Sequence, residues 1–195
     1  MKTLIVYTHP TRDSLNGAFL QEVIRGCGAN PMAGEVQVTD LYAEQFDPVL
    51  VFGNGRRRRD MHLVPELARY REQLLWADRL VFVYPIWWGR PPAMLLGYID
   101  RMFAAGFAYR NKGGMLPEGL LKGKSAVCIS TMMGPSLYMP LWLHNAHKTL
   151  MRKALLNYVG IKKVKFFQFG SMESPKGKQK AKLERVHRYF QTANA

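Results

Sequence analysis

The chain has 195 residues, a length typical of one domain, and 48% of them are hydrophobic. Two cysteines are too few for a disulfide framework or a CxxC zinc cluster, and the apolar fraction excludes a globally disordered chain. The apolar runs are about six residues long, whereas a helix that crosses a bilayer needs about 20. The N-terminus enters a strand pattern without a signal-peptide core. We therefore expect one cytoplasmic domain over residues 1–195.

The formal net charge is +14, and half of it comes from residues 161–195, which hold nine basic and two acidic residues. Such a charge raises encounter rates with anionic partners, among them nucleic acid and a phosphorylated cofactor such as NADPH. The sequence has no zinc-finger spacing, no basic zipper and no aromatic RNP-like strand. Nucleic acid is therefore the less favoured partner, although charge alone does not separate the two.

In the first half of the chain, apolar periodicity predicts strands that alternate with helices. The first strand is a nearly continuous apolar run, as in a parallel sheet covered on both faces, and Ser14 suits the N-cap of the helix that follows it. The expected elements are a strand over 3–8, a helix over 15–27, a strand over 35–41, a helix over 65–76 and a strand over 80–84, with turns at 46–48 and 53–55.

The second half continues the alternation. We expect a helix that opens at Pro91 and Pro92, a long loop up to residue 123, a strand over 125–130, a helix over 141–158, an edge strand over 164–169 and a basic helix over 177–190. Five strands alternating with five helices predict an α/β fold, a doubly wound parallel sheet with helices on both faces. In such folds ligands bind outside the carboxyl ends of the strands. The loops at 9–16, 85–91 and 131–138 are therefore the candidate site.

The first two loops favour a phosphate and a planar ring. His9 and Ser14 lie beside a helix N-terminus, which attracts anions, but the loop has neither a Walker lysine nor a GxGxxG motif. A flavin phosphate fits this loop, and the alternative is that Ser14 only caps the helix. Trp87 and Trp88 in the second loop can stack on a planar ligand, and core packing or a dimer contact is an equally good interpretation.

The third loop supplies hydroxyls and then Tyr138, with His144 six residues later and His147 on the following helical turn. A phenol and an imidazole can hydrogen-bond a redox ring, but ordinary polar side chains are the alternative that the residues alone favour. No carboxylate pair completes a metal site with the two histidines. The run Arg56–Arg59 suits a solvated loop, and Cys128 suits an inert buried thiol.

Taken together, the loops resemble those of the flavodoxin-like NAD(P)H:quinone oxidoreductases, the family of DT-diaphorase, the bacterial modulators of drug activity and the potassium-efflux ancillary reductases. The resemblance covers the chain from Thr3 to about Phe190. It is carried by THPTRDSLN (8–16), TDLYAEQFDP (39–48), FVYPIWWGRPPAMLLGYIDRMFAAGFAY (82–109) and the pair Tyr138 and His144. The third segment is the most specific, because it matches the family's Pro-hydrophobic-x-Trp loop and the helix after it.

The resemblance implies a noncovalent flavin, FMN or FAD, and assigns residues to it by position. FMN is the favoured one because the chain is short and shows no separate adenosine-binding segment. His9, Ser14, Leu15 and Asn16 would hold the phosphate, Pro85, Ile86, Trp87 and Trp88 would border the ring, and Thr131, Met132, Met133 and Gly134 would follow its polar edge. Tyr138 and His144 would be catalytic. The family usually has glycine where Met132 and Met133 stand, so their side chains are expected to narrow the pocket or displace the loop.

The resemblance also implies a reaction and partners. NADPH or NADH would reduce the flavin by hydride transfer and leave, and a quinone or another planar acceptor would then take the electrons, which is ping-pong turnover. The basic charge favours NADPH. A homodimer with the active site at its interface is expected. The alternative function is a flavin-binding regulator of a membrane transporter, with the basic tail as its contact surface.

Overall fold

The computed structural model describes residues 1–53, 57–113, 117–174 and 178–192. Several residues singled out above lie outside these ranges, namely Asn54 and Gly55 of a predicted turn, Arg56 of the arginine run and Gly177 at the predicted start of the last helix.

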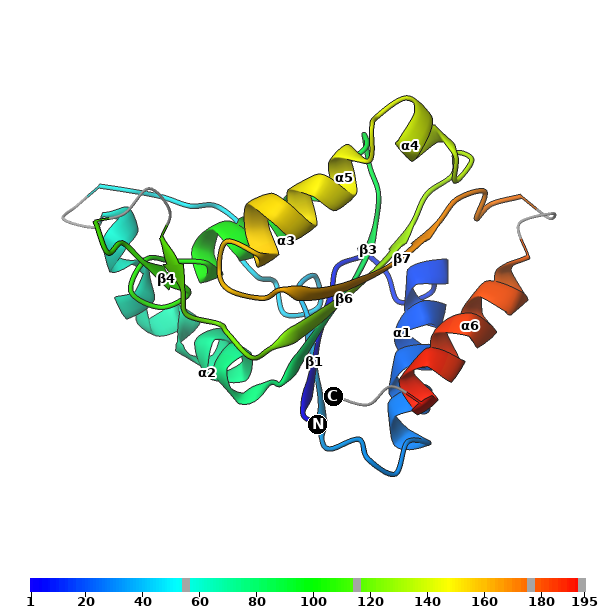
Figure 1. Ribbon diagram of the computed structural model, residues 1–195, viewed down its shortest axis with the longest axis horizontal. Coiled ribbons are helices and arrows are strands. Elements are labelled where there is room, and N and C mark those ends of the chain that lie inside the picture. The colour runs from blue at the N-terminus through cyan, green and yellow to red at the C-terminus, as the bar shows by residue number, and fades with distance from the viewer. Residues whose placement is uncertain (54–56, 114–116, 175–177, 193–195) are drawn as a thin grey trace.

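Five parallel strands form the central sheet. The strands are β1 (Thr3–Tyr7), β2 (Val36–Asp40), β3 (Arg79–Pro85), β6 (Ser125–Thr131) and β7 (Lys163–Phe169), in the order β2-β1-β3-β6-β7 (Figure 1). Every residue of β1 and β3 is buried, as the continuous apolar runs predict, whereas β7 alternates between exposed and covered side chains at the edge. The predicted fold class is confirmed. The strand order reverses between β1 and β3, where a ligand crevice is expected.

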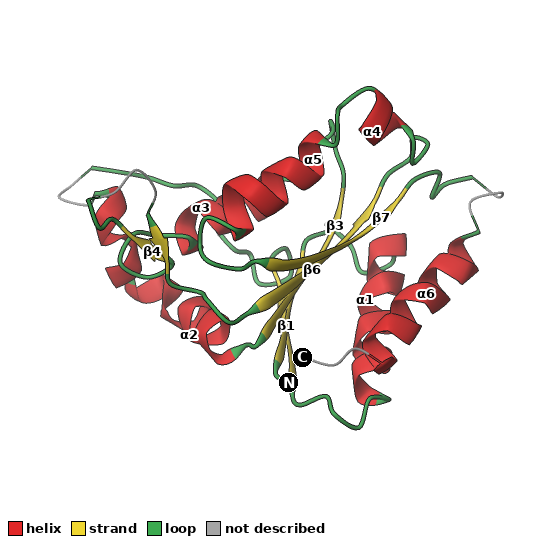
Figure 2. Cartoon of the chain, viewed as in Figure 1, coloured by secondary structure: helices red, strands yellow, loops and turns green. Residues whose placement is uncertain are grey.

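Helices cover both faces of this sheet (Figure 2). On one face lie α1 (Leu15–Gly28) and α6 (Gln179–Thr192), and on the other lie α2 (Ala68–Trp76), α3 (Ala93–Met102) and α5 (Ala146–Thr149) with the π-helix η3 (Leu150–Leu156) that continues it. Each face buries its own apolar cluster, so the sheet separates two cores. Within the described residues, no helix is long and apolar enough to cross a membrane.

The helix predicted over 141–158 is wrong as one continuous element. The chain forms a single turn, α4 (Tyr138–Leu141), and then breaks before α5. His144 and Asn145 at the break have φ of +44° and +56°, a left-handed conformation that asparagine tolerates better than most residues. The break means that His144 and His147 do not share a helix. It also turns His147 into the core, where the side chain is fully buried.

Two regions without predicted regular structure contain short elements. The long loop before β6 pairs β4 (Tyr109–Arg110) with β5 (Glu118–Gly119) in an antiparallel ladder. The segment before α2 forms the 3-10 helices η1 (Arg58–Leu63) and η2 (Pro65–Leu67), so the helix predicted from residue 65 begins with a 3-10 turn. Elements this short leave little periodicity in a sequence.

Candidate functional site

A cavity of about 880 Å³ lies at the carboxyl end of the sheet, within the size range of small-molecule sites. The loops after β1, β3 and β6 line it, together with α4 and the segment after β7. The lining residues are His9, Ser14, Leu15, Asn16, Pro85, Ile86, Trp87, Trp88, Gly89, Thr131, Met132, Met133, Gly134, Tyr138, Met139, Leu143, Met172 and Glu173. The structure thus brings together all the residues that the resemblance assigns to a flavin.

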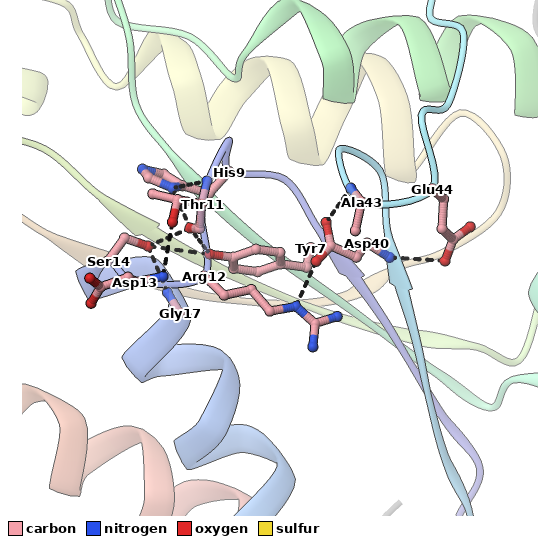
Figure 3. Close-up of polar contacts among 10 residues, drawn as sticks. All are labelled: Tyr7, His9, Thr11, Arg12, Asp13, Ser14, Gly17, Asp40, Ala43 and Glu44. Atoms are coloured by element: carbon pink, nitrogen blue, oxygen red, sulfur yellow. Dashed lines mark hydrogen bonds and ion pairs between the residues drawn. The ribbon is translucent and has the colours of Figure 1, made fainter.

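The loop after β1 is fixed by hydrogen bonds to its own backbone (Figure 3). The Tyr7 hydroxyl donates to the Thr11 carbonyl at 2.8 Å and lies 3.2 Å from Ser14 Oγ, which also lies 3.0 Å from that carbonyl. Burial raises the pKa of Tyr7, so its hydroxyl keeps the proton that it donates. His9 Nδ1 lies 2.7 Å from the same carbonyl. Three side chains therefore converge on one peptide group and hold the loop in place.

Two further contacts hold this loop against the rest of the fold. Arg12 Nε donates to Asp40 Oδ2 at 2.7 Å, and Asp40 is nearly buried at the end of β2 (Figure 3). Gly17 lies so close to the loop that a Cβ there would stand 1.8 Å from the Arg12 carbonyl oxygen. The loop is therefore packed directly on the first turn of α1, and this contact requires glycine.

The first turn of α1 offers an anion site to the cavity. Ser14 is the N-cap, with extended backbone, and its Oγ accepts from the Gly17 N–H at 3.1 Å. The N–H groups of Leu15 and Asn16 lie in the first turn, so the helix has no earlier carbonyl to which they could donate. Because these groups carry the positive end of the helix dipole, they suit a phosphate at this end of the cavity.

The loop after β3 turns back on itself at the opposite wall. Trp87 and Arg90 pair in an antiparallel bridge, with backbone hydrogen bonds of 3.0 and 3.1 Å. Trp88 and Gly89 between them have φ of +52° and +72°, as a type I′ turn requires at both central positions. Trp88 is 96% exposed and Trp87 is 41% exposed. Both indoles are therefore available at the cavity for stacking on a planar group.

The loop after β6 is tied to α1 and to the segment after β7. Asn16 Nδ2 donates to Thr131 Oγ1 at 3.0 Å, and both side chains are buried. The Met132 N–H donates to the Phe169 carbonyl at 2.9 Å. Met132 packs inward against Ile86, whereas Met133 is exposed. The cavity has a volume of about 880 Å³ with both methionine side chains in its wall, so these residues do not close it.

Tyr138 and His144 occupy different positions relative to the cavity. Tyr138 lines it, is half-exposed and lies parallel to Trp142, with ring centroids 6.4 Å apart. His144 is exposed beyond α4 and is not among the described residues that line the cavity. Cys128 is buried, and burial raises the pKa of its thiol to about 12, which agrees with the inert thiol predicted.

Sequence reasoning missed two groups of lining residues. Met139 belongs to α4, which begins before the predicted helix, and Leu143 lies at the break inside that helix. Met172 and Glu173 follow β7, and the rule that pointed to the other strand ends applies to this one as well. Among the described residues, no group of three or more histidine, cysteine, aspartate or glutamate side chains is placed to hold a metal ion.

The cavity fits a flavin, by the chemistry of its lining. Its α1 end offers N–H groups and a hydroxyl for a phosphate, and its walls at Ile86, Trp87 and Met132 offer apolar and aromatic side chains for a fused ring. The arrangement places a polar end and an aromatic end in one continuous space, as a ring joined to a phosphate requires.

Comparison with known proteins agrees with the fold. Residues 1–192 match the family model described as having a flavodoxin-like fold. A Haemophilus influenzae protein named as an uncharacterized NAD(P)H oxidoreductase is 29% identical over 177 residues, which are 88% of this chain and 85% of that protein. The NAD(P)H dehydrogenase [quinone] 1 of Cavia porcellus is 28% identical over 70% of this chain, and the match spans 55% of its own length.

Solved structures extend these likenesses over the whole chain. A crystal structure from Streptococcus mutans UA159 is 39% identical, with a TM-score of 0.90, and covers 99% of this chain and 100% of its own. An NAD(P)H:quinone oxidoreductase from Methanothermobacter marburgensis has a TM-score of 0.86 at 24% identity, with 98% of each chain covered, which supports the fold. The chain belongs to the flavodoxin-like family that contains the NAD(P)H:quinone oxidoreductases.

Proposed function

We propose that this chain is a flavin-dependent NAD(P)H oxidoreductase that acts in the cytoplasm on quinones or other planar acceptors. The observation that carries the proposal is the continuous cavity that joins the N-terminus of α1 to the turn at Trp87 and Trp88. A bound flavin supplies the two-electron chemistry, since it accepts hydride from a nicotinamide and passes the electrons to an acceptor. FMN is the favoured flavin, with FAD as the alternative.

The residues around the cavity would bind and orient this group. The N–H groups of Leu15 and Asn16, with the hydroxyl of Ser14 and the ring of His9, would hold its phosphate. Pro85, Ile86, Trp87 and Trp88 would border one side of the ring, and the segment Thr131–Gly134 would follow its polar edge. Asn16 would keep that segment at a fixed distance from the phosphate end through its hydrogen bond to Thr131.

Tyr138 and His144 are the proposed catalytic groups. Tyr138 lines the cavity, so its hydroxyl would donate a hydrogen bond where negative charge develops during reduction. His144 lies outside the lining, next to the left-handed Asn145. For His144 to contact a substrate, the break between α4 and α5 would have to move toward the cavity, or a second copy of the chain would have to bring its own cavity near.

The exposed apolar side chains around the cavity support a homodimer. Met133, Leu137, Leu141 and Trp142 are each at least 65% exposed, and Trp88 is almost fully so. A cluster of this kind on the rim of a site is typical of a covered surface. We propose that a second copy covers it, which would place the active site at the interface. A single site between the two copies would admit the electron donor and the acceptor in turn, which predicts ping-pong turnover. NADPH would be the preferred donor because of the basic charge.

The purified full chain tests this proposal directly. We expect a yellow protein, release of FMN on heating, and loss of the yellow colour when NADPH is added without oxygen. Initial rates at several quinone concentrations should give parallel double-reciprocal lines. A colourless chain that takes up neither FMN nor FAD would contradict the function, and intersecting lines would contradict the ping-pong order alone. The variant Tyr138→Phe, which removes only the hydroxyl, should bind FMN normally, but NADPH should reduce its flavin more slowly.

A further inference from the structure

A second, strongly cationic pocket lies at the opposite end of the sheet from the first. It has a volume of about 660 Å³ and lies where β6 and β7 begin, next to β5 and the C-terminal end of η3. Strand β6 separates it from the flavin cavity by about 20 Å, since each strand residue advances about 3.3 Å. Five lysines line this pocket against one carboxylate, that of Glu118. They are Lys122, Lys124, Lys153, Lys162 and Lys163.

The walls of this pocket come from two segments that the fold holds together. The Leu121 N–H donates to the Val159 carbonyl at 2.9 Å, which joins the loop after β5 to the turn after η3. Gly119 packs so closely on that turn that a Cβ would stand 2.2 Å from the Gly160 nitrogen. In Figure 1, the end of the yellow helix and the start of β7 lie on the same side of the molecule as β4. These backbone contacts therefore fix the shape of the pocket.

Contacts within the chain engage only some of the lysines that line this pocket. Lys112, Lys122 and Arg110 each pair with the Glu118 carboxylate at 2.7 Å, and these contacts hold the pKa of Glu118 well below its usual range. Lys124 donates to the Leu75 carbonyl at 2.9 Å.

The remaining lysines are less engaged. Lys162 donates to the Asn157 carbonyl at 3.2 Å, as a cation at a helix C-terminus does. The side chains of Lys153 and Lys163 make no hydrogen bond or ion pair with any residue that the structure describes, and both are exposed. The ammonium groups of these two lysines can therefore bind an anionic ligand in the pocket.

Other lining groups offer contacts beyond charge. Tyr158 is 40% exposed and is held edge-on by Tyr109, with ring centroids 5.0 Å apart. The Asn157 side-chain oxygen is buried and has no hydrogen-bond partner among the described residues, so it could accept from a hydroxyl group. Lysine is a common phosphate ligand, and a concave cationic surface concentrates anions.

We propose that this pocket binds a small anion with two or more phosphoryl groups, separately from the flavin cavity. A singly charged anion would leave most of the lysine charge unbalanced, and a flat polyanion such as duplex nucleic acid would not reach into a concavity. Inorganic oligophosphate and a nucleoside polyphosphate share the chemistry that the lysines recognise. The side chains of Tyr158 and Asn157 would add contacts only to the nucleotide.

Calorimetric titration of the purified full chain with tripolyphosphate, and separately with ATP, tests the proposal at 0.15 M salt. We expect saturable binding, and the double variant Lys153→Glu, Lys163→Glu should bind the probe at least about tenfold more weakly. The control Lys180→Glu, Arg188→Glu makes the same change in net charge on α6, where both side chains are exposed, and should change binding less than about threefold. A comparison of the two probes separates the inorganic from the nucleotide ligand.

Chemical footprinting localises the site without relying on a variant. Amine acetylation followed by mass spectrometry should show Lys153 and Lys163 protected by the bound probe, and Lys180 unprotected. The proposal is overturned by an equal loss of affinity in both double variants, by protection spread evenly over all lysines, or by binding of duplex DNA without saturable binding of either probe. Each of these results would mean that only the overall charge attracts anions.

Discussion

The hydroxyl of Tyr84 lies 2.7 Å from Nε2 of His147, and both side chains are completely buried between the sheet and α5. The other ring nitrogen, Nδ1, lies 3.2 Å from the Gln168 side-chain oxygen. Because that oxygen only accepts, Nδ1 carries the proton and Nε2 accepts from Tyr84. Strands β3 and β7 are thereby joined to α5, which begins directly after the break that follows α4.

Removal of the Tyr84 hydroxyl should destabilise the fold. Tyr84→Phe keeps the ring but leaves Nε2 of His147 as a buried acceptor without a donor, which costs about 1–3 kcal/mol. The free energy of unfolding, measured in urea, gives this difference. The control is Tyr158→Phe at a half-exposed position, where we expect a change within about 0.5 kcal/mol. An equal effect of the two substitutions would mean that the buried hydrogen bond contributes nothing.

The same histidine should make stability depend on pH. Burial, with a smaller effect of Lys148, lowers the pKa of His147 to about 4 from its ordinary value of 6.5. The unfolded chain therefore binds more protons than the folded one between these values, and the free energy of unfolding falls as the pH drops from 6.5 toward 4. The loss attributable to this group is about 3 kcal/mol by linkage.

His147→Gln tests this dependence, because glutamine can keep a hydrogen bond but does not titrate. Urea unfolding at pH 4.5 and pH 7 should show a smaller difference for the variant than for the natural chain. Parallel stability curves for the two proteins across this interval would show that His147 does not titrate as its burial requires.

The frame of the site follows from sequence patterns, whereas its details depend on tertiary contacts. Continuous apolar runs predicted β1 and β3, and the position of Ser14 after a strand predicted the start of α1. The segment around His144 and Asn145 did not show its break. After the break, His147 is buried against Tyr84, 63 residues away in sequence, and a local pattern cannot show such a contact. The cavity residue Glu173 was predictable, since the end of β7 lies at the same edge as the other strand ends.

Ser14 has a structural role and a proposed binding role, and two substitutions separate them. Ser14→Ala removes the cap and should lower the free energy of unfolding by about 1 kcal/mol. It should also weaken FMN binding. Ser14→Asp keeps a capping oxygen and suits the helix dipole, so stability should be retained, but its charge would repel a phosphate. Urea unfolding and FMN fluorescence quenching measure the two effects. Undiminished FMN affinity in Ser14→Asp would place the phosphate elsewhere.

Trp88 gives the sharpest test of whether the turn after β3 is shaped for binding. A tryptophan with φ of +52° and a side chain 96% exposed is unfavourable for stability on both counts. Trp88→Asn would create the Asn-Gly pair that type I′ turns prefer. The isolated chain should therefore gain up to about 1 kcal/mol in the free energy of unfolding.

The same substitution should impair function, because it removes an indole from the cavity wall and from the proposed dimer surface. We expect a higher KM for the quinone acceptor and a weaker dimer by analytical ultracentrifugation, while FMN remains bound through the α1 end of the cavity. Trp87→Phe, which keeps an aromatic ring in the same turn, is the matched control and should change both readouts less. A Trp88→Asn protein that is more stable and fully active as a dimer would show that the strained turn serves neither the acceptor nor the partner.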